Sequence, residues 1–346
     1  MRPKQSQIMK NLKMTLGMIL GTAVFLTSCD DNENEVTPSM VSIYATNNSD
    51  GNVTVYDVSG SSTTSTTLKT SSTAADGAYY DGSSVFQVSR SNNSIEGFTA
   101  MASTSVGGII DVNVDLSGTS DMTSPRELAV NGNLYVVADN ADADGNDATK
   151  DGRLFVYQKS GNSFTLRNTI TTDIKLWGIT FIGNDLYAVV DTENKLAVYT
   201  DFLSNSSTTS MSASKTVAIE GLVRTHGLTY DSMTGTMVLT DIAAASNGQD
   251  DGGFHVIGDF MSKFNSTSSG GTIALSDQIR VSGSNTKLGN PVDVAYDGET
   301  GTVYIAEAGN GGGRILAFSN IGSGGNLTPS MDQTLASASS VYLYKN

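Results

Sequence analysis

Apolar and polar residues alternate in short runs along most of the chain, and clusters of Gly, Ser, Thr, Asn and Asp separate the runs. The runs are rich in β-branched and aromatic residues, which suit a pleated sheet, and the polar clusters are typical of turns. No long segment after residue 40 keeps the 3.6-residue period of an amphipathic helix. The pattern predicts an all-β fold, with one domain over residues 40–346.

The pattern also repeats. Residues 127–139 contain a strand, a tight turn with Gly and Asn, and a second apolar strand that ends in aspartate. The same order recurs at residues 178–191, 227–241 and 292–307. A third, alternating strand follows each copy, at residues 154–157, 196–199, 254–257 and 315–318, and looser fourth strands follow at 166–170, 215–219 and 279–281. Four antiparallel strands per repeat correspond to one blade of a β-propeller.

Two weaker copies precede these four. One begins at residues 78–88, with 95–98 and 109–114 predicted as its later strands. The other, at residues 42–45 and 53–56, lacks a first strand.

The final apolar run, residues 340–344, has no strand after it to pair with. We expect it to supply the missing inner strand of the first blade, because closing the ring removes open sheet edges. The prediction is a six-bladed β-propeller. A seven-bladed ring is the alternative, because the Ser/Thr-rich stretches 61–73 and 204–215 could hide strands.

The units resemble the NHL and YVTN families of β-propeller repeats, whose second strand typically ends in Val-Ala-Asp or Val-Thr-Asn. Residues 137–139 have this Val-Ala-Asp sequence. The resemblance covers nearly all of the chain after residue 40. It implies the architecture and leaves the activity open, because propellers carry many unrelated functions.

The N-terminal segment has the layout of a secretory signal: four basic residues, an apolar run over 14–26, and small residues. That run is shorter than the roughly 20 residues a membrane-spanning helix needs. Residues 26–29, Leu-Thr-Ser-Cys, resemble the lipobox of bacterial lipoproteins, which implies cleavage after residue 28 and a lipid on Cys29. An ordinary signal peptide with a chance cysteine is the alternative.

Residues 29–39 are predicted to form an acidic, flexible tether between the lipid and the propeller. Acidic residues at this place resemble the surface-export signal of some Gram-negative lipoproteins. We therefore expect an outer-membrane protein exposed on the cell surface. Retention at the inner membrane, facing the periplasm, is the alternative.

Cys29 is the only cysteine, so the chain can form no internal disulfide. Its net charge of −15 becomes −19 without the signal, which carries four basic and no acidic residues. This acidity argues against nucleic acid as a partner and against electrostatic docking on anionic lipid. A monomeric domain is expected.

Chemistry is expected at one mouth of the central channel, where loops from several blades converge. One ring of polar residues ends the second strands, and another begins the first strands. The first ring is Asn47, Arg90, Asp139, Asp191, Asp241 and Glu307, and the second is Asp76, Arg126, Glu127, Trp177, His226 and Asn290. From these rings we predict ligand-binding roles for Arg90, Arg126, Trp177, Asp191, His226, Asp241, Asn290 and Glu307.

His226, Glu307 and Glu127 are the candidates for catalysis, because an imidazole or a carboxylate can act as a general base. The structural alternatives are a hydrogen-bonded histidine and, for the aspartates after the second strands, acceptors in Asx-type turns. Trp177 could stack on a sugar or peptide, or simply plug the channel. Residues 124–127, Ser-Pro-Arg-Glu, resemble the Pro-Arg-His start of some lactonase propellers, but glutamate replaces the histidine, which puts that activity in doubt.

A calcium loop is predicted at residues 140–151. Oxygen-bearing side chains fall at positions 1, 3, 5 and 12, with glycine at 6, as in an EF-hand loop. The predicted ligands are Asn140, Asp142, Asp144 and Asp151. The flanking helices of an EF-hand are missing, and a solvated turn is the alternative.

These observations favour a non-enzymatic, surface-anchored module that binds a glycan, peptide or protein partner at its loop face. The alternative is a lactonase-like or metal-assisted hydrolase at the channel mouth. No nucleophile, base and orienting group occur together in the sequence, which favours binding.

Overall fold

The computed structural model describes residues 40–99, 107–146, 148–244 and 248–346. The predicted signal, Cys29 and the predicted tether lie outside the described residues. Among the described residues, no helix has both the length and the apolar character needed to cross a bilayer.

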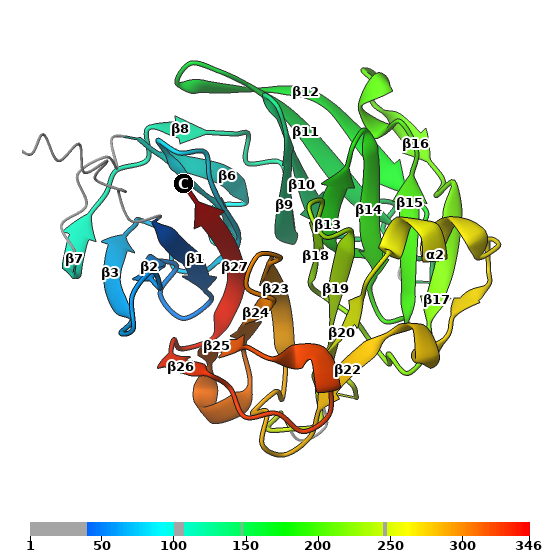
Figure 1. Cartoon of the computed structure of the whole chain (residues 1–346). Helices are drawn as coiled ribbons and strands as arrows, with labels where there is room; N and C mark the ends of the chain where they lie inside the picture. Colours follow the sequence, from blue (N-terminus) through cyan, green and yellow to red (C-terminus); the bar gives the residue numbers. More distant parts are fainter. Residues whose placement is uncertain (1–39, 100–106, 147, 245–247) are drawn as a thin grey trace, which may run out of the picture. The chain divides into compact units, whose positions relative to one another are not determined.

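Six small sheets form a ring, so the fold is the predicted six-bladed β-propeller (Figure 1). The strand nearest the channel in each blade is called the inner strand. From the inner strand outward, blade 1 contains β27 (Ala338–Lys345), β1 (Val41–Asn47), β2 (Val53–Asp57), β3 (Thr64–Lys69) and β7 (Gly108–Asp111). Blade 2 contains β4 (Ala75–Tyr80), β5 (Val85–Ser89), β6 (Ser94–Phe98) and β8 (Leu116–Ser117). Blade 3 contains β9 (Pro125–Asn131), β10 (Leu134–Asp139), β11 (Gly152–Ser160), β12 (Ser163–Thr172) and β16 (Thr209–Met211).

The other three blades follow the same plan. Blade 4 contains β13 (Leu176–Ile182), β14 (Asp185–Val190), β15 (Lys195–Tyr199), β17 (Lys215–Ile219) and β21 (Thr272–Ile273). Blade 5 contains β18 (Leu228–Asp231), β19 (Thr236–Asp241), β20 (Gly253–Ile257) and β22 (Ile279–Ser282). Blade 6 contains β23 (Pro291–Asp297), β24 (Thr302–Glu307), β25 (Arg314–Phe318) and β26 (Met331–Thr334). Short helices connect some strands: α2 (Phe260–Ser266), η1 (Phe202–Ser204), η2 (Leu275–Asp277), η3 (Asn310–Gly312) and η4 (Ile321–Ser323).

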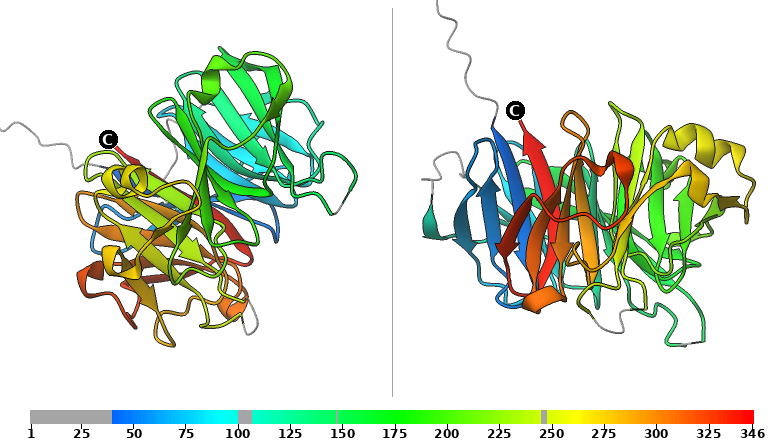
Figure 2. Two further views of the ribbon diagram at one scale, coloured as in Figure 1. Left: turned by 90° about the vertical axis from the view of Figure 1, so that its right-hand side faces the viewer. Right: turned by 60° about the horizontal axis from the view of Figure 1, so that its bottom comes forward.

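The C-terminal strand closes the ring, as the sequence predicts. β27 pairs antiparallel with β1, with Val41 opposite Lys345 at one end of the ladder and Asn47 opposite Ala338 at the other. Beyond this ladder, the backbone N–H of Asn346 donates to the carbonyl of Met40 at 3.2 Å. The C-terminus therefore lies beside the start of β1, which Figure 2 shows from the side. Pairing the two ends of the domain leaves blade 1 without a missing strand.

The hydrophobic core is divided into six clusters, one at each interface between neighbouring blades. Strand β14 shows why, because its alternate residues face opposite sides of the sheet. Leu186, Ala188 and Val190 pack against blade 3, while Tyr187 and Val189 pack against blade 5. A sheet that is buried on both faces needs apolar residues at successive positions, which is why the second strands are nearly continuous apolar runs.

Some strand assignments differ from the prediction. Residues 109–114 do not complete blade 2: β7 instead adds to blade 1 in parallel with β3, and the two-residue β8 takes the outer place in blade 2. The stretches that could have hidden a seventh blade hold β3 of blade 1 and β16 of blade 3. Among the described residues there is no seventh sheet. These outer strands are short and polar, so their partners could not be assigned from the hydrophobic pattern.

Candidate functional site

The inner strands begin with a common register. In five blades, the first residue of the inner strand pairs with the last residue of the second strand, and a β-bulge lies within three residues of this pair. The following residue therefore lies at an equivalent level around the channel in each blade: Ser339, Asp76, Arg126, Trp177 and Val292. In blade 5, Ile242 donates to the carbonyl of Arg224 as Asn140 donates to that of Ser124 in blade 3, which places His226 at this level.

Four of these residues interact in a row across blades 2 to 5. Arg126 Nη1 lies 3.4 Å from Asp76 Oδ2, and the Arg126 guanidinium carbon lies 4.2 Å from the centre of the Trp177 ring. The Trp177 and His226 rings are parallel within 1°, with centroids 3.6 Å apart. A salt bridge, a cation–π contact and a ring stack thus join neighbouring blades. The sequence predicted that these residues converge, and the structure shows how they pack.

Asp191 closes the row. Its Oδ1 lies 3.3 Å from His226 Nε2 and accepts hydrogen bonds from Arg224 Nε and Nη2 at 3.0 and 2.8 Å. Burial raises the pKa of Asp191, but the bonds from His226, Arg224 and Asn140 outweigh it and hold the pKa below the usual value. Burial lowers the pKa of His226, which is 4% exposed. A buried, stacked histidine with a lowered pKa is neutral at pH 7 and has little freedom to move.

The residues that end the second strands hold the neighbouring loops. Asp139 accepts hydrogen bonds from the Ser124 backbone N–H and from Arg153 Nη2, both at 2.6 Å. Asp241 accepts three backbone N–H groups, those of Val223, Arg224 and Ala243. Asn47 accepts the N–H groups of Ser49 and Asp50 in the same way. Asp139 and Asp241 are fully buried. Asp241 and Asn47 each accept the N–H group two residues on, as in the Asx-type alternative, whereas Asp139 accepts N–H groups of the loop before β9.

Glu307 has an equivalent role with a longer side chain. Its carboxylate accepts the backbone N–H groups of Gly289, Asn290, Gly309 and Asn310 at 2.7 to 3.0 Å. Burial raises its pKa to about 7, although the four N–H groups act in the opposite direction. Asn290 meets Glu307 through its backbone. Through these contacts Glu307, at the end of β24, fixes the backbone before β23 and the backbone after β24.

Arg90 and Asp191 belong to a different level from the other members of the first predicted ring. Their N–H groups donate to the carbonyls of Ala74 and Lys175, the bond made by the residue after the strand end in other blades. Successive strand residues point to opposite sides, so this offset of one residue changes their partners. Arg90 Nε lies 3.6 Å from Asp76 Oδ2, and Asp191 contacts His226.

One residue further along the inner strands, two carboxyl groups meet in the channel. Glu127 from blade 3 and Asp293 from blade 6, on opposite sides of the ring, share a side-chain hydrogen bond. Burial and mutual repulsion raise the pKa of Glu127, and burial raises that of Asp293 to about 7. Asp293 Oδ2 also accepts Ser340 Oγ at 2.7 Å and Val341 N–H at 2.8 Å. Both shifts favour a proton held between the two carboxyls.

A pocket of about 530 Å³ extends from this pair along the channel, and all six inner strands line it. This volume is within the range of small-molecule sites. Aromatic residues from five of the six strands contribute to the wall: Tyr79, Phe181, Tyr230, Tyr296 and Tyr342. Of the predicted site residues, Glu127 is the one that lines it. The pocket thus lies on the far side of the Trp177 level, towards the ends of the inner strands.

Asp293 and the aromatic wall were not among the site residues predicted from the sequence. The signal for Asp293 was present in the repeat, because Gly77, Gly178 and Gly227 stand at the equivalent place in other blades. A Cβ atom on Gly178 would lie 2.3 Å from the carbonyl oxygen of His226, so this level tolerates few side chains. An acid that replaces glycine here must extend into the channel or pair locally. The aromatic residues occur one per strand, and only the register places them together.

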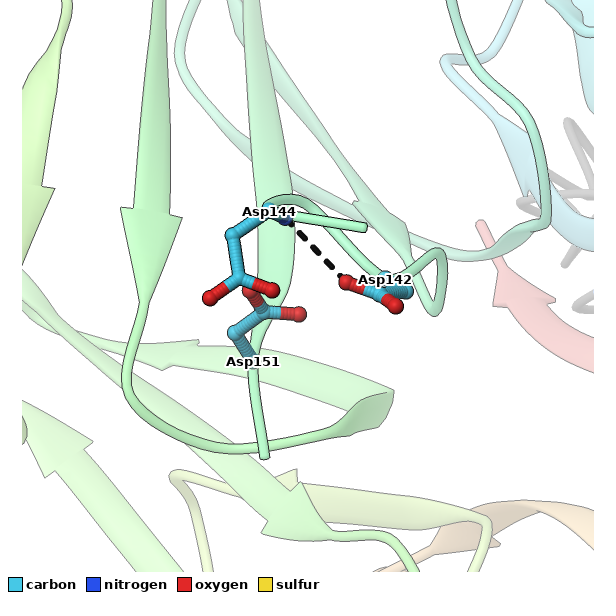
Figure 3. A group of neighbouring side chains, drawn as sticks. All are labelled: Asp142, Asp144 and Asp151. Carbon is cyan, nitrogen blue, oxygen red and sulfur yellow. Dashed lines mark hydrogen bonds between the residues drawn. The ribbon is translucent and has the colours of Figure 1, made fainter. Parts of the chain in front are cut away.

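Three of the predicted calcium ligands come together. Side-chain oxygens of Asp142, Asp144 and Asp151 lie within 4.8 Å of one another in the loop between β10 and β11 (Figure 3). Asp142 accepts the N–H groups of Asp144 and Gly145, and Asp151 accepts that of Ala143. The fourth predicted ligand, Asn140, instead donates through Nδ2 to Asp191 Oδ2 at 3.0 Å. The three carboxylates are suitable ligands for Ca²⁺, a hard cation that prefers oxygen.

The chain matches no protein-family profile and no curated protein sequence. It is similar in structure to a chain in the crystal structure of a nidogen/laminin complex, with a TM-score of 0.56 and 11% identity over 88% of this chain and 98% of that one. At this identity the likeness shows the fold alone. A computationally designed protein, Ika8, aligns with a TM-score of 0.41 and 9% identity over 86% of this chain and 76% of the designed one.

Proposed function

We propose that this protein is a surface-anchored binding module that receives a glycan, peptide or protein group in its central channel. The observation that carries the proposal is the pocket of about 530 Å³, into which five of the six inner strands contribute an aromatic side chain. Aromatic walls bury apolar surface of a ligand at little cost in side-chain entropy, and they suit sugar rings and side chains equally. The rigid ring of blades holds this wall in place before a ligand arrives.

The anchor in this proposal is a lipid on Cys29, with residues 29–39 as the tether and the outer face of the outer membrane as the location. The lipobox-like residues 26–29 support it. We also propose that the loop over residues 140–151 binds Ca²⁺, supported by its three converging carboxylates.

A hydrolase centred on His226 is the competing proposal, and the geometry gives it less support. His226 is buried against Trp177, and its partner Asp191 is held by Arg224. Glu307 is occupied by four backbone N–H groups. A general base must come within about 3 Å of the proton it removes, and neither residue lines the pocket.

The test is binding by the purified protein to arrays of glycans and peptides, followed by calorimetry with each positive. A Thr180→Trp variant fills part of the pocket wall, and we expect it to weaken binding at least tenfold. Val223→Trp, at a residue 55% exposed and outside the pocket, is the matched control and should bind like the wild type. Both variants must retain the wild-type melting temperature within a few degrees.

Two results would contradict the proposal. One is saturable binding that Thr180→Trp leaves unchanged, which would move the site out of the channel. The other is turnover of lactone or ester substrates that is lost in His226→Ala and Glu307→Ala, which would favour the hydrolase.

A further inference from the structure

The floor of the channel pocket carries two carboxyls, and no cation among the described residues pairs with them. Glu127 and Asp293 have each other, Ser340 and backbone N–H groups as partners. The nearest cation at the level above, Arg126, pairs with Asp76 and stacks on Trp177. Both carboxyls line the same pocket and repel each other when ionised, and in the absence of a counter-charge this favours a proton held between them.

The mouth of the pocket does not supply that counter-charge. Lys345 is the one basic residue of the lining, and its Nζ is held by Asp297 Oδ1 at 2.9 Å and Glu299 Oε2 at 2.7 Å. The other charged lining residues are Glu127, Asp231 and Asp293, all acidic. The protein as a whole carries a net charge of −15, which adds to the attraction for a positive ligand.

The walls suit the same kind of ligand. Tyr342 and Tyr79 are in contact, with ring centroids 4.9 Å apart, and both line the pocket together with Phe181, Tyr230 and Tyr296. Aromatic rings attract cations and also bury an aliphatic stem. Glu127 retains some exposure to the pocket, so an incoming group can reach it.

We propose that the channel ligand carries a primary ammonium group, which binds between Glu127 and Asp293 with its apolar stem along the aromatic wall. This inference rests on the proposed function and names the chemical class that the pocket selects. The ammonium replaces the shared proton: its three N–H donors bond to the carboxylate oxygens, and one proton leaves to the buffer. The net charge of the floor then stays at −1, as it was with the shared proton, because the ammonium takes the place of the proton that leaves.

Calorimetry with n-pentylammonium chloride and with 1-pentanol tests the inference, because the two probes share a stem and differ in charge. We expect the ammonium to bind at least tenfold more tightly than the alcohol at pH 7. Titrations at pH 6 in two buffers of different ionisation enthalpy should show about one proton released per ammonium bound. The titratable groups that face the pair are Asp76 and, through it, Arg126.

The variant Glu127→Gln/Asp293→Asn keeps the size of both side chains and removes their charge. We expect it to lose at least tenfold in affinity for pentylammonium and none for pentanol. The control variant Asp121→Asn/Asp201→Asn replaces two carboxylates with amides at exposed positions outside the pocket, and it should bind like the wild type. If the double variant does not fold, Asp293→Asn alone serves, since its amide oxygen can still accept from Ser340 and Val341.

Equal affinity for the two probes, or full affinity in the pair variant, overturns the inference. A different result would reject only the ligand class: array ligands that lack an ammonium group bind, Thr180→Trp blocks their binding, and pentylammonium does not bind. The proposed function would then stay in place. If neither the arrays nor the probes bind, the proposed function itself fails.

Discussion

At the scale of the residue, an offset of one position separates structural side chains from those that face the channel. Asp139, Asp241 and Glu307 end their strands and accept backbone N–H groups, while Asp191, one position later, reaches His226. The sequence shows an acidic residue near the end of four second strands, and it contains no mark of the offset. The register between each inner strand and its neighbour sets it, and register depends on how two strands pair.

The carboxyl pair predicts a pH dependence of stability. Asp293 has a pKa of about 7 in the folded protein against 3.8 as the reference for the unfolded chain. Between these values the folded state binds more protons, so this group's contribution to stability is full below pH 4 and declines as the pH rises to 7. The slope is at most about 1.4 kcal/mol per pH unit for one proton.

Urea denaturation of the wild type and of Asp293→Asn at pH 5 and pH 8 measures this effect. Carboxylates with lowered pKa values, such as Asp191, are ionised in both the folded and the unfolded state across this range and add no trend, and the difference between the two proteins is the readout. We expect the wild type to lose stability relative to the variant as the pH rises. A difference that stays constant across this range would contradict the shared proton.

At the scale of the element, the loop between β10 and β11 predicts a response to calcium. Ca²⁺ that binds only the folded state raises its stability by RT ln(1 + [Ca²⁺]/Kd), about 2.7 kcal/mol at a hundredfold excess over Kd. We expect millimolar Ca²⁺ to raise the melting temperature of the wild type, and Asp144→Asn to reduce the shift. Asp121→Asn, at an exposed residue outside the loop, is the control.

Isothermal titration with Ca²⁺ can also contradict the calcium site. No heat and no change in melting temperature at millimolar Ca²⁺ would leave the three carboxylates as caps of their own turn. Their bonds to the N–H groups of Ala143, Gly145 and Asn146 already suffice for that role.

At the scale of the whole molecule, the lipid anchor predicts where the protein is found. Cys29→Ser removes the acylation site, and we expect it to move the protein from the membrane fraction to the soluble fraction of cells. Two acyl chains bury enough methylene groups, at about 0.8 kcal/mol each, for stable anchoring of the wild type. Protease added to intact cells should digest the wild type if it lies on the outer surface.

A control and a contrary outcome accompany this experiment. Ser39→Ala, at the end of the tether, should fractionate like the wild type. Membrane association that persists in Cys29→Ser would exclude the lipid as the anchor. Protection from protease in intact cells, with digestion after lysis, would favour the periplasm-facing alternative.

The sequence by itself determined the architecture, because a sheet buried on both faces needs apolar residues at successive positions, and that demand recurs in every blade. It also determined the closure of the ring, since residues 340–344 had no other strand to pair with. The sequence predicted a strand at β7 but assigned it to the wrong blade, and β8 and β16 escaped prediction because short polar strands carry no hydrophobic pattern. The meeting of Glu127 with Asp293, 166 residues apart in the chain, was decided only by the tertiary structure, which sets blades 3 and 6 on opposite sides of one channel. Side-chain contact across a ring depends on register and curvature, and neither is written in the pattern of any single strand.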